Sequence, residues 1–112
     1  MNHKSNIYVA GHNGLVGSAI VRELKKKGFK KIITATRGQL DLTNQEKVLK
    51  FLKKRRPDFI IIAAAKVGGI YSNNTYKGQF IYENLMIQSN LIHSAFLCKI
   101  KNLIFLGSSC IY

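Results

Sequence analysis

The sequence of 112 residues is short of acidic side chains. It holds five Asp and Glu against 18 Lys and Arg, so its formal net charge is +13. Such a charge attracts anions, which include nucleotides, nucleic acid and acidic membranes, but a lysine-rich solvated surface is the commoner explanation. The basic clusters KKKGFKK and KKRR come without an aromatic platform or a nucleic-acid-binding motif. We therefore expect no nucleic-acid partner.

Cysteine and long apolar runs are also scarce. Cys98 and Cys110 lie 12 residues apart with no C-x-x-C spacing, which argues against a metal site. We expect both thiols to be reduced, as in a cytoplasmic protein. The sequence shows no basic-then-apolar leader with a small-residue cleavage site. No apolar run reaches the roughly 18 residues that span a bilayer, so we expect no membrane partner.

Apolar residues make up 46% of the chain, which suits one folded domain and argues against disorder. Their spacing predicts strands that alternate with helices. The predicted strands cover residues 7–10, 31–36, 59–65 and 103–106, and the predicted helices cover residues 15–27, 43–55 and 80–98. The strand FIIIAAA is apolar on both faces, which is typical of a parallel sheet covered on both sides. We expect an α/β fold with right-handed crossovers and the strand order 3-2-1-4, with the fourth strand at an edge.

Local signals predict where the helices end and which faces they bury. Gly28 should end the first helix, and Thr43 with Glu46 should form a capping box at the start of the second. The helical spacing picks out Val16, Ala19, Ile20 and Leu24 in the first helix and Val48, Leu49 and Leu52 in the second. In the third helix, the residues expected to face inward are Ile81, Leu85, Ile92, Ala95 and Phe96.

A glycine-rich turn lies between the first predicted strand and the first predicted helix. Residues 9–18 read VAGHNGLVGS, in which Gly11, Gly14 and Gly17 give the spacing G-x-x-G-x-x-G. Missing side chains allow a tight turn, a close approach to pyrophosphate and close packing of helix on strand. The helix N-terminus then offers N–H groups to phosphate. The pattern predicts a Rossmann-like dinucleotide site, although packing alone could also explain the glycines. The candidate cofactor-binding residues are Gly11, His12, Asn13, Gly14, Leu15, Val16 and Gly17.

The end of the second predicted strand indicates which dinucleotide binds. NAD-binding domains usually place Asp or Glu there to hold the ribose hydroxyl, but residues 34–37 read TATR. Arg37 lies 20 residues after Gly17 and could form a bidentate contact with a 2′-phosphate. We therefore favour NADP over NAD, the alternative being a solvent-exposed arginine. Asp41 and Leu42 could lie near the adenine, with capping or solvation of the loop before Thr43 as an equal alternative for Asp41.

Four longer segments carry a family resemblance. AGHNGLVGSAI, TATRGQLDL, IIAAAKVGGI with NNTY, and LIFLGSSCIY together resemble the GDP-L-fucose synthases, the GDP-4-keto-6-deoxy-mannose epimerase/reductases of the extended short-chain dehydrogenase/reductases. The resemblance implies that residues 1–112 are the N-terminal part of an NADP-binding Rossmann domain, an incomplete doubly wound parallel sheet without the substrate domain. It also implies NADP as cofactor, a nucleotide-sugar substrate and a homodimer when the chain is complete.

The same resemblance assigns roles to further residues. Ser108 matches the catalytic serine, and Cys110 matches the cysteine that exchanges a proton on the sugar carbon. Without the family match, a strand-end serine and a small buried cysteine would be the simpler explanation. Many members have an arginine where this chain has Asn13, a departure that would weaken phosphate binding. The other positions expected to lie along the cofactor are Ala63, Ala64, Ala65, Leu106, Gly107 and Ser109.

The superfamily's Tyr-x-x-x-Lys pair is missing from these 112 residues. None of the five tyrosines has a lysine four positions later. In the family, tyrosine donates the proton and lysine lowers its pKa, so we expect this chain as given to be inactive. Two alternatives stay open: a non-catalytic NADP-binding module, and a basic polyanion-binding protein whose glycine turn holds another phosphate.

Overall fold

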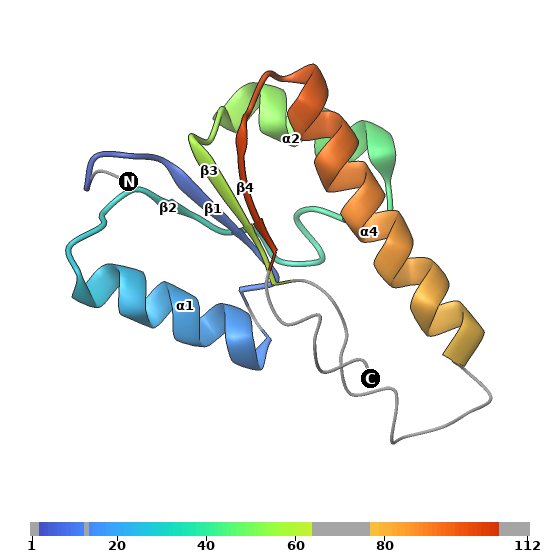
Figure 1. Ribbon diagram of the computed structural model, residues 1–112, viewed down its shortest axis with the longest axis horizontal. Helices are drawn as coiled ribbons and strands as arrows, with labels where there is room; N and C mark the ends of the chain where they lie inside the picture. The colour runs from blue at the N-terminus through green and yellow to red at the C-terminus, as the bar shows by residue number, and fades with distance from the viewer. Residues whose placement is uncertain (1–2, 13, 64–76, 106–112) are drawn as a thin grey trace.

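Four parallel strands form one sheet in the computed structural model, which describes residues 3–12, 14–63 and 77–105. The strands are β1 (Ile7–Ala10), β2 (Ile32–Ile33), β3 (Phe59–Ile62) and β4 (Asn102–Phe105), and the helices are α1 (Leu15–Lys26), α2 (Gln45–Arg55) and α4 (Lys77–Leu97). Strands and helices alternate along the chain, and all strand pairs are parallel (Figure 1). The predicted α/β class with a doubly wound parallel sheet is therefore confirmed.

The expected strand order 3-2-1-4 is wrong, because the sheet has the order β2-β1-β3-β4. The chain returns from β2 across β1, and β3 pairs with β1 from Ile7↔Phe59 to Ala10↔Ile62. Since crossovers are right-handed, this reversal of direction moves the next helix to the opposite face. Figure 1 shows α1 on one face of the sheet and α2 with α4 on the other. The order reverses between β1 and β3, where doubly wound sheets of this order bind their ligands.

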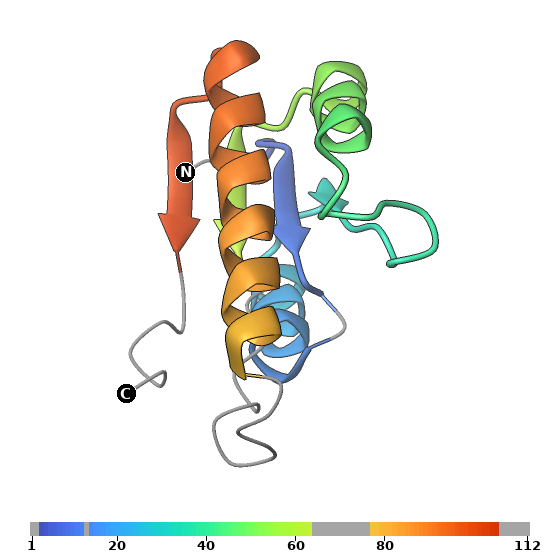
Figure 2. The same cartoon turned by 90° about the vertical axis from the view of Figure 1, so that its right-hand side faces the viewer.

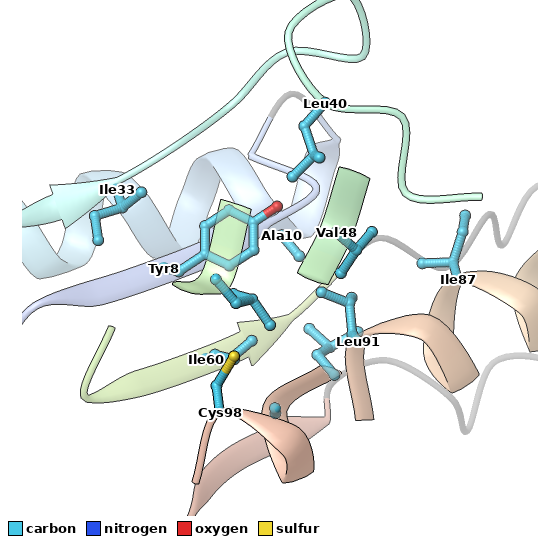
Figure 3. Packing of buried hydrophobic residues seen from close by; sticks show 12 residues of the cluster. Tyr8, Ala10, Ile33, Leu40, Val48, Ile60, Ile87, Leu91 and Cys98 are labelled. Carbon is cyan, nitrogen blue, oxygen red and sulfur yellow. The ribbon is translucent and has the colours of Figure 1, made fainter. Parts of the chain in front are cut away.

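Both faces of β1 are buried, as the covered sheet requires. Ile7 and Val9 face α1, where they pack with Ile20 and Leu24. The alternate residues face α2 and α4, and Figure 3 shows the buried side chains of this second layer. They include Tyr8, Ala10, Ile60, Ile62, Val48, Leu52, Ile87 and Leu91. Of the spaced apolar positions in α1, Val16 and Ala19 are instead exposed.

Gly28 ends α1, as predicted. Its φ is +95°, a left-handed conformation that glycine adopts without steric cost. The Gly28 N–H donates to the Lys25 carbonyl at 3.1 Å, and the Phe29 N–H donates to the Leu24 carbonyl at 3.0 Å. Phe29 and Leu24 belong to the same apolar cluster under α1. This pair of bonds with its apolar contact is a Schellman motif, so the local sequence decides where the helix stops.

The predicted capping box at the start of α2 is wrong. The N-cap is Asn44, whose side-chain oxygen accepts the Lys47 N–H at 3.1 Å. Thr43 lies one residue before the cap, and its hydroxyl donates to Asp41 Oδ1 at 2.6 Å. The buried stripe of α2 is confirmed, since Val48 and Leu52 are fully buried.

The second strand is shorter than predicted. Only Ile32 and Ile33, of the expected residues 31–36, pair with β1. A tight turn follows, in which the Thr36 N–H donates to Gln39 Oε1 at 2.9 Å and the Gln39 N–H donates to Thr36 Oγ1 at 3.2 Å. These local side-chain bonds satisfy the backbone where the ladder would otherwise continue.

The predicted inward face of α4 is largely wrong. Leu85, Ile92 and Phe96 are exposed, whereas Ala95 is fully buried as expected. Among the described residues, the buried ones are Ile87, Asn90, Leu91, Ser94 and Ala95 in the helix and Cys98 directly after it. Ser94 and Ala95 are small residues on this buried face, and apolar residues remain on the outer side as well. The helix begins at Lys77, earlier than predicted, and the side chain of Ile81 lies outside the described residues.

Candidate cofactor-binding site

The glycine turn directly follows β1. Gly11 has a φ of +89°, which strongly favours glycine, and its carbonyl accepts the Gly14 N–H at 3.1 Å. A Cβ placed on Gly17 would lie 1.9 Å from the Gly11 carbonyl oxygen. A Cβ on Gly14 would meet the same oxygen at 3.5 Å, an ordinary contact. The turn therefore needs glycine at positions 11 and 17 for two different reasons, backbone conformation and close packing.

The N-terminus of α1 is suited to an anion. Gly14 is the N-cap and has no side chain to cap the helix, and no acidic residue lies in the first turn. The first N–H groups of a helix have no partner within it, and they carry the positive end of its dipole. Leu15 is 88% exposed beside them. Phosphate oxygens are the ligands that such a helix end binds best.

Arg37 sits in the turn that Thr36 and Gln39 hold together. Besides the two side-chain bonds, the Leu40 N–H donates to the Thr36 carbonyl at 2.8 Å, and the Leu40 side chain is buried in the core. The turn is thus fixed on its C-terminal side while Arg37 itself is exposed. A guanidinium held in this way is available to an anion in the neighbouring hollow.

A hollow of about 160 Å³ joins the glycine turn to the loop after β2. Its lining residues are Gly11, His12, Gly14, Ala35, Arg37, Leu40, Asp41, Leu42, Thr43 and Ile87. Pockets that enclose drug-sized ligands measure roughly 300–1,000 Å³, so this hollow suits one end of a dinucleotide. It lies at the carboxyl ends of the strands, where open α/β sheets place their ligands.

Asp41 both lines this hollow and fixes the loop. Its Oδ1 accepts the Thr43 hydroxyl at 2.6 Å and the Thr43 N–H at 3.0 Å. The hydrogen bond from the Thr43 side chain, followed by that from its backbone and by the nearby charges of Lys47 and Arg37, lowers the pKa of Asp41. Asp41 is therefore a carboxylate at neutral pH, and both of the roles considered for it, beside the hollow and capping before Thr43, are compatible.

The structure brings six of the predicted cofactor-binding residues to one hollow: Gly11, His12, Gly14, Arg37, Asp41 and Leu42. Leu15 and Val16 are exposed at the start of α1, and Gly17 is buried beneath the turn. Ala63 continues the pairing of β3 with β1, since its N–H donates to the Ala10 carbonyl at 2.9 Å. The remaining candidates lie outside the described residues: Asn13, Ala64, Ala65, Leu106, Gly107, Ser108, Ser109 and Cys110.

Four lining residues escaped the sequence-based prediction: Ala35, Leu40, Thr43 and Ile87. The first three flank predicted residues, so proximity in sequence was their signal. Ile87 comes from α4, and its apolar spacing with Leu91 and Ala95 marks the face that packs on the sheet. The sequence-based prediction missed it because Leu85, Ile92 and Phe96 form a second apolar stripe on the same helix.

The described ranges 3–12, 14–63 and 77–105 hold no group of three His, Cys, Asp or Glu side chains that could bind a metal ion. Within the same ranges, no helix is long and apolar enough to cross a lipid bilayer. The Cys98 thiol is free and buried.

The fold and the glycine turn agree with the comparison to known families. The model of the NAD dependent epimerase/dehydratase family matches residues 7–112. The chain therefore belongs to the NAD dependent epimerase/dehydratase family.

Within this family, the chain is similar to enzymes that are named for GDP-sugars. GDP-L-fucose synthase 1 of Arabidopsis thaliana is 56% identical over all of this chain, and GDP-L-fucose synthase of Escherichia coli is 49% identical over 97% of it. The chain spans 35% and 34% of these relatives' own lengths. The structure of MlghC, a GDP-mannoheptose C4 reductase from Campylobacter jejuni with NADP bound, superposes with a TM-score of 0.88 at 44% identity, covering 96% of this chain and 34% of that one.

Proposed function

We propose that this chain is the N-terminal, cofactor-binding part of a GDP-L-fucose synthase and that it holds the adenosine end of NADP(H). That enzyme class converts GDP-4-keto-6-deoxy-mannose to GDP-L-fucose by epimerisation and NADPH-dependent reduction. The observation that carries the proposal is the hollow that joins Gly11 and Gly14 to Arg37, more than 20 residues further along the chain. The 56% identity to the plant synthase supports the substrate class.

Each part of the site has a role in this proposal. The Gly11–Gly17 turn and the N-terminus of α1 bind the pyrophosphate, and Arg37 binds the 2′-phosphate. The Asp41–Leu42 segment forms the wall beside the adenine. When bound, the nicotinamide supplies the hydride. We assign to Ser108 a hydrogen bond to the substrate carbonyl and to Cys110 proton exchange beside it, although both lie outside the described residues.

NADPH fluorescence tests the binding part of this proposal. Titrating the chain into NADPH is expected to change the nicotinamide emission with a saturable binding curve, and heparin, a polyanion, should not displace the cofactor at physiological salt. Displacement by heparin with no preference for NADPH over inorganic pyrophosphate would favour a basic polyanion-binding protein instead.

The second candidate function is a non-catalytic NADP-binding module. The observation in its favour is that no Tyr-x-x-x-Lys pair occurs in the 112 residues. We expect the chain alone to bind NADPH without oxidising it in the presence of GDP-4-keto-6-deoxy-mannose. A longer chain that carries the pair should oxidise NADPH with this substrate. Failure of such a chain to turn over would favour the binding module.

We also propose that the outer side of α4 pairs with a second copy of the chain. Tyr82, Leu85, Ile92 and Phe96 recur at helical spacing, and their exposed fractions are 61%, 58%, 41% and 74%. Figure 2 shows that no other described element covers this side of α4. An exposed apolar stripe of this length indicates an interface. Two copies of α4 related by a two-fold axis would bury their stripes against each other.

Replacing Phe96 by lysine should abolish this self-association. Sedimentation velocity is expected to show a dimer for the wild-type chain and a monomer for Phe96→Lys, because a charge would be buried within the apolar contact. His93→Lys, an exposed position beside the stripe, is the matched control and should remain dimeric. A monomeric wild-type chain would refute the homodimer and assign the stripe to another partner, such as the remainder of a longer chain.

We propose a cytoplasmic location for the protein, since Cys98 is a buried free thiol and the proposed cofactor is a soluble metabolite. Fractionation of cells that express the protein should place it with cytoplasmic markers, and recovery with a secreted or envelope fraction would refute the proposal.

A further inference from the structure

Asn90 is one of the two polar side chains that are buried on the inner face of α4 among the residues that the structure describes. It is 8% exposed and lies among the apolar residues Ile87 and Leu91. Its Nδ2 donates a hydrogen bond of 2.8 Å to the carbonyl of Leu42, 48 residues away in sequence. A buried amide costs free energy unless it is bonded. The contact therefore joins α4 to a loop that the sheet does not hold.

Residues 40–44 form one wall segment, of which Leu40, Asp41, Leu42 and Thr43 line the hollow. The first residue of the segment, Leu40, is buried in the core, and the last, Asn44, is the N-cap of α2. Within the segment, Asp41 bonds to Thr43, so that contact moves with the loop. The bond from Asn90 to Leu42 connects the middle of this wall to a long helix packed on the sheet.

The other residue that α4 contributes to this region is Ile87, one helical turn before Asn90. Ile87 lines the hollow directly, whereas Asn90 does not. Thus Ile87 provides an apolar surface, and Asn90 fixes the distance between α4 and the opposite wall. Loss of the amide would leave the Leu42 carbonyl without its buried donor, so the wall would move toward water to satisfy it.

The geometry points to Asn90 as a positioning residue for the adenosine end of the cofactor. It acts through the Leu42 carbonyl, without touching the ligand, by keeping the 40–44 wall at the width that grips the adenosine. This inference rests on the proposed function, because it takes the hollow to be the adenosine site.

Asn90→Leu tests the inference because leucine fills the same space in the core but donates no hydrogen bond. Binding of 2′,5′-ADP, which is the adenosine end of NADP alone, should weaken about tenfold by isothermal titration calorimetry, as expected for one lost buried bond. Far-UV circular dichroism should show the variant fully folded at the same temperature. Wild-type affinity in a folded Asn90→Leu chain would overturn the inference.

Ser94→Ala is the matched control. Ser94 lies one turn further along the same buried face, and its hydroxyl has no hydrogen-bond partner within the described residues. Its removal should leave the affinity for 2′,5′-ADP unchanged. An equal loss of affinity in both variants would assign the effect to general packing of α4 and overturn the positioning role.

Two further measurements complete the test. In the wild-type chain, saturation with 2′,5′-ADP should shift the side-chain amide NMR resonances of Asn90, and resonances that do not move would overturn the inference without any variant. In Asn90→Leu without ligand, amide exchange at Thr43 and Asn44 should be faster than in wild type. If the wild-type chain binds no 2′,5′-ADP, the proposed function fails, while unchanged exchange at these two amides would show that the positioning role fails.

Discussion

Arg37→Ala is expected to weaken NADPH binding about 30- to 100-fold and to leave NADH binding within about twofold. The guanidinium lies at the rim of the hollow, in a turn closed by reciprocal bonds between Thr36 and Gln39. NADPH and NADH differ only in the 2′-phosphate, so a contact specific to that group changes one affinity and not the other. Fluorescence titrations with both cofactors measure the two effects side by side.

Arg22→Ala provides the matched control for charge. Arg22 is an exposed arginine on α1 and does not line the hollow, and its removal lowers the net charge by the same amount. We expect it to leave the ratio of the NADPH and NADH dissociation constants unchanged. Equal affinities of the wild-type chain for both cofactors would refute the assignment of Arg37.

Gly17→Ala should destabilise the chain by about 3 kcal/mol and eliminate cofactor binding, because overpacking against atoms that cannot yield has costs at the upper end of the usual range. The added Cβ would lie 1.9 Å from the Gly11 carbonyl oxygen and 2.7 Å from its carbon. Both atoms belong to the backbone of the turn, so relief requires α1 to move away from β1. Urea unfolding followed by circular dichroism measures the loss.

Gly14→Ala separates this steric effect from a general need for glycine. Gly14 has an extended backbone with a φ of −74°, and an added Cβ would stand at an ordinary 3.5 Å from the Gly11 oxygen. Alanine at an N-cap that tolerates glycine should cost about 1 kcal/mol or less. Comparable destabilisation by the two substitutions would contradict the packing argument for Gly17.

Local sequence signals predicted the elements whose limits depend on neighbouring residues. The glycine turn, the start of α1 and the Schellman end at Gly28 each follow from a few adjacent positions. The capping box failed because Asn44, the residue after Thr43, is also of a type that caps helices well and takes the N-cap position.

Long-range features were less accessible. The strand order depends on the side of β1 to which the chain returns, and no single residue specifies this. The inner face of α4 was mistaken because the helix is apolar on both sides. Its buried face carries the polar residues Asn90 and Ser94, which lower its apparent hydrophobicity.

The candidate site likewise has parts that local sequence signals predict and parts that depend on long-range packing. Motif spacing pointed to the glycine turn and to Arg37, and Asp41 and Leu42 were named because they follow Arg37 closely in sequence. The contribution of α4 could not be predicted, since tertiary packing alone brings Ile87 to the hollow and Asn90 to the Leu42 carbonyl. The predicted roles of Ser108 and Cys110 stay predictions.

Because β2 is short, the residues that select the cofactor can change independently of the sheet. With only Ile32 and Ile33 in the ladder, the turn from Thr36 to Gln39 adds no pair to the sheet, and its side-chain bonds are internal. Leu40 marks the point where the core resumes. A lineage could therefore exchange these four residues, and with them the preference for one dinucleotide, while the rest of the domain keeps its packing.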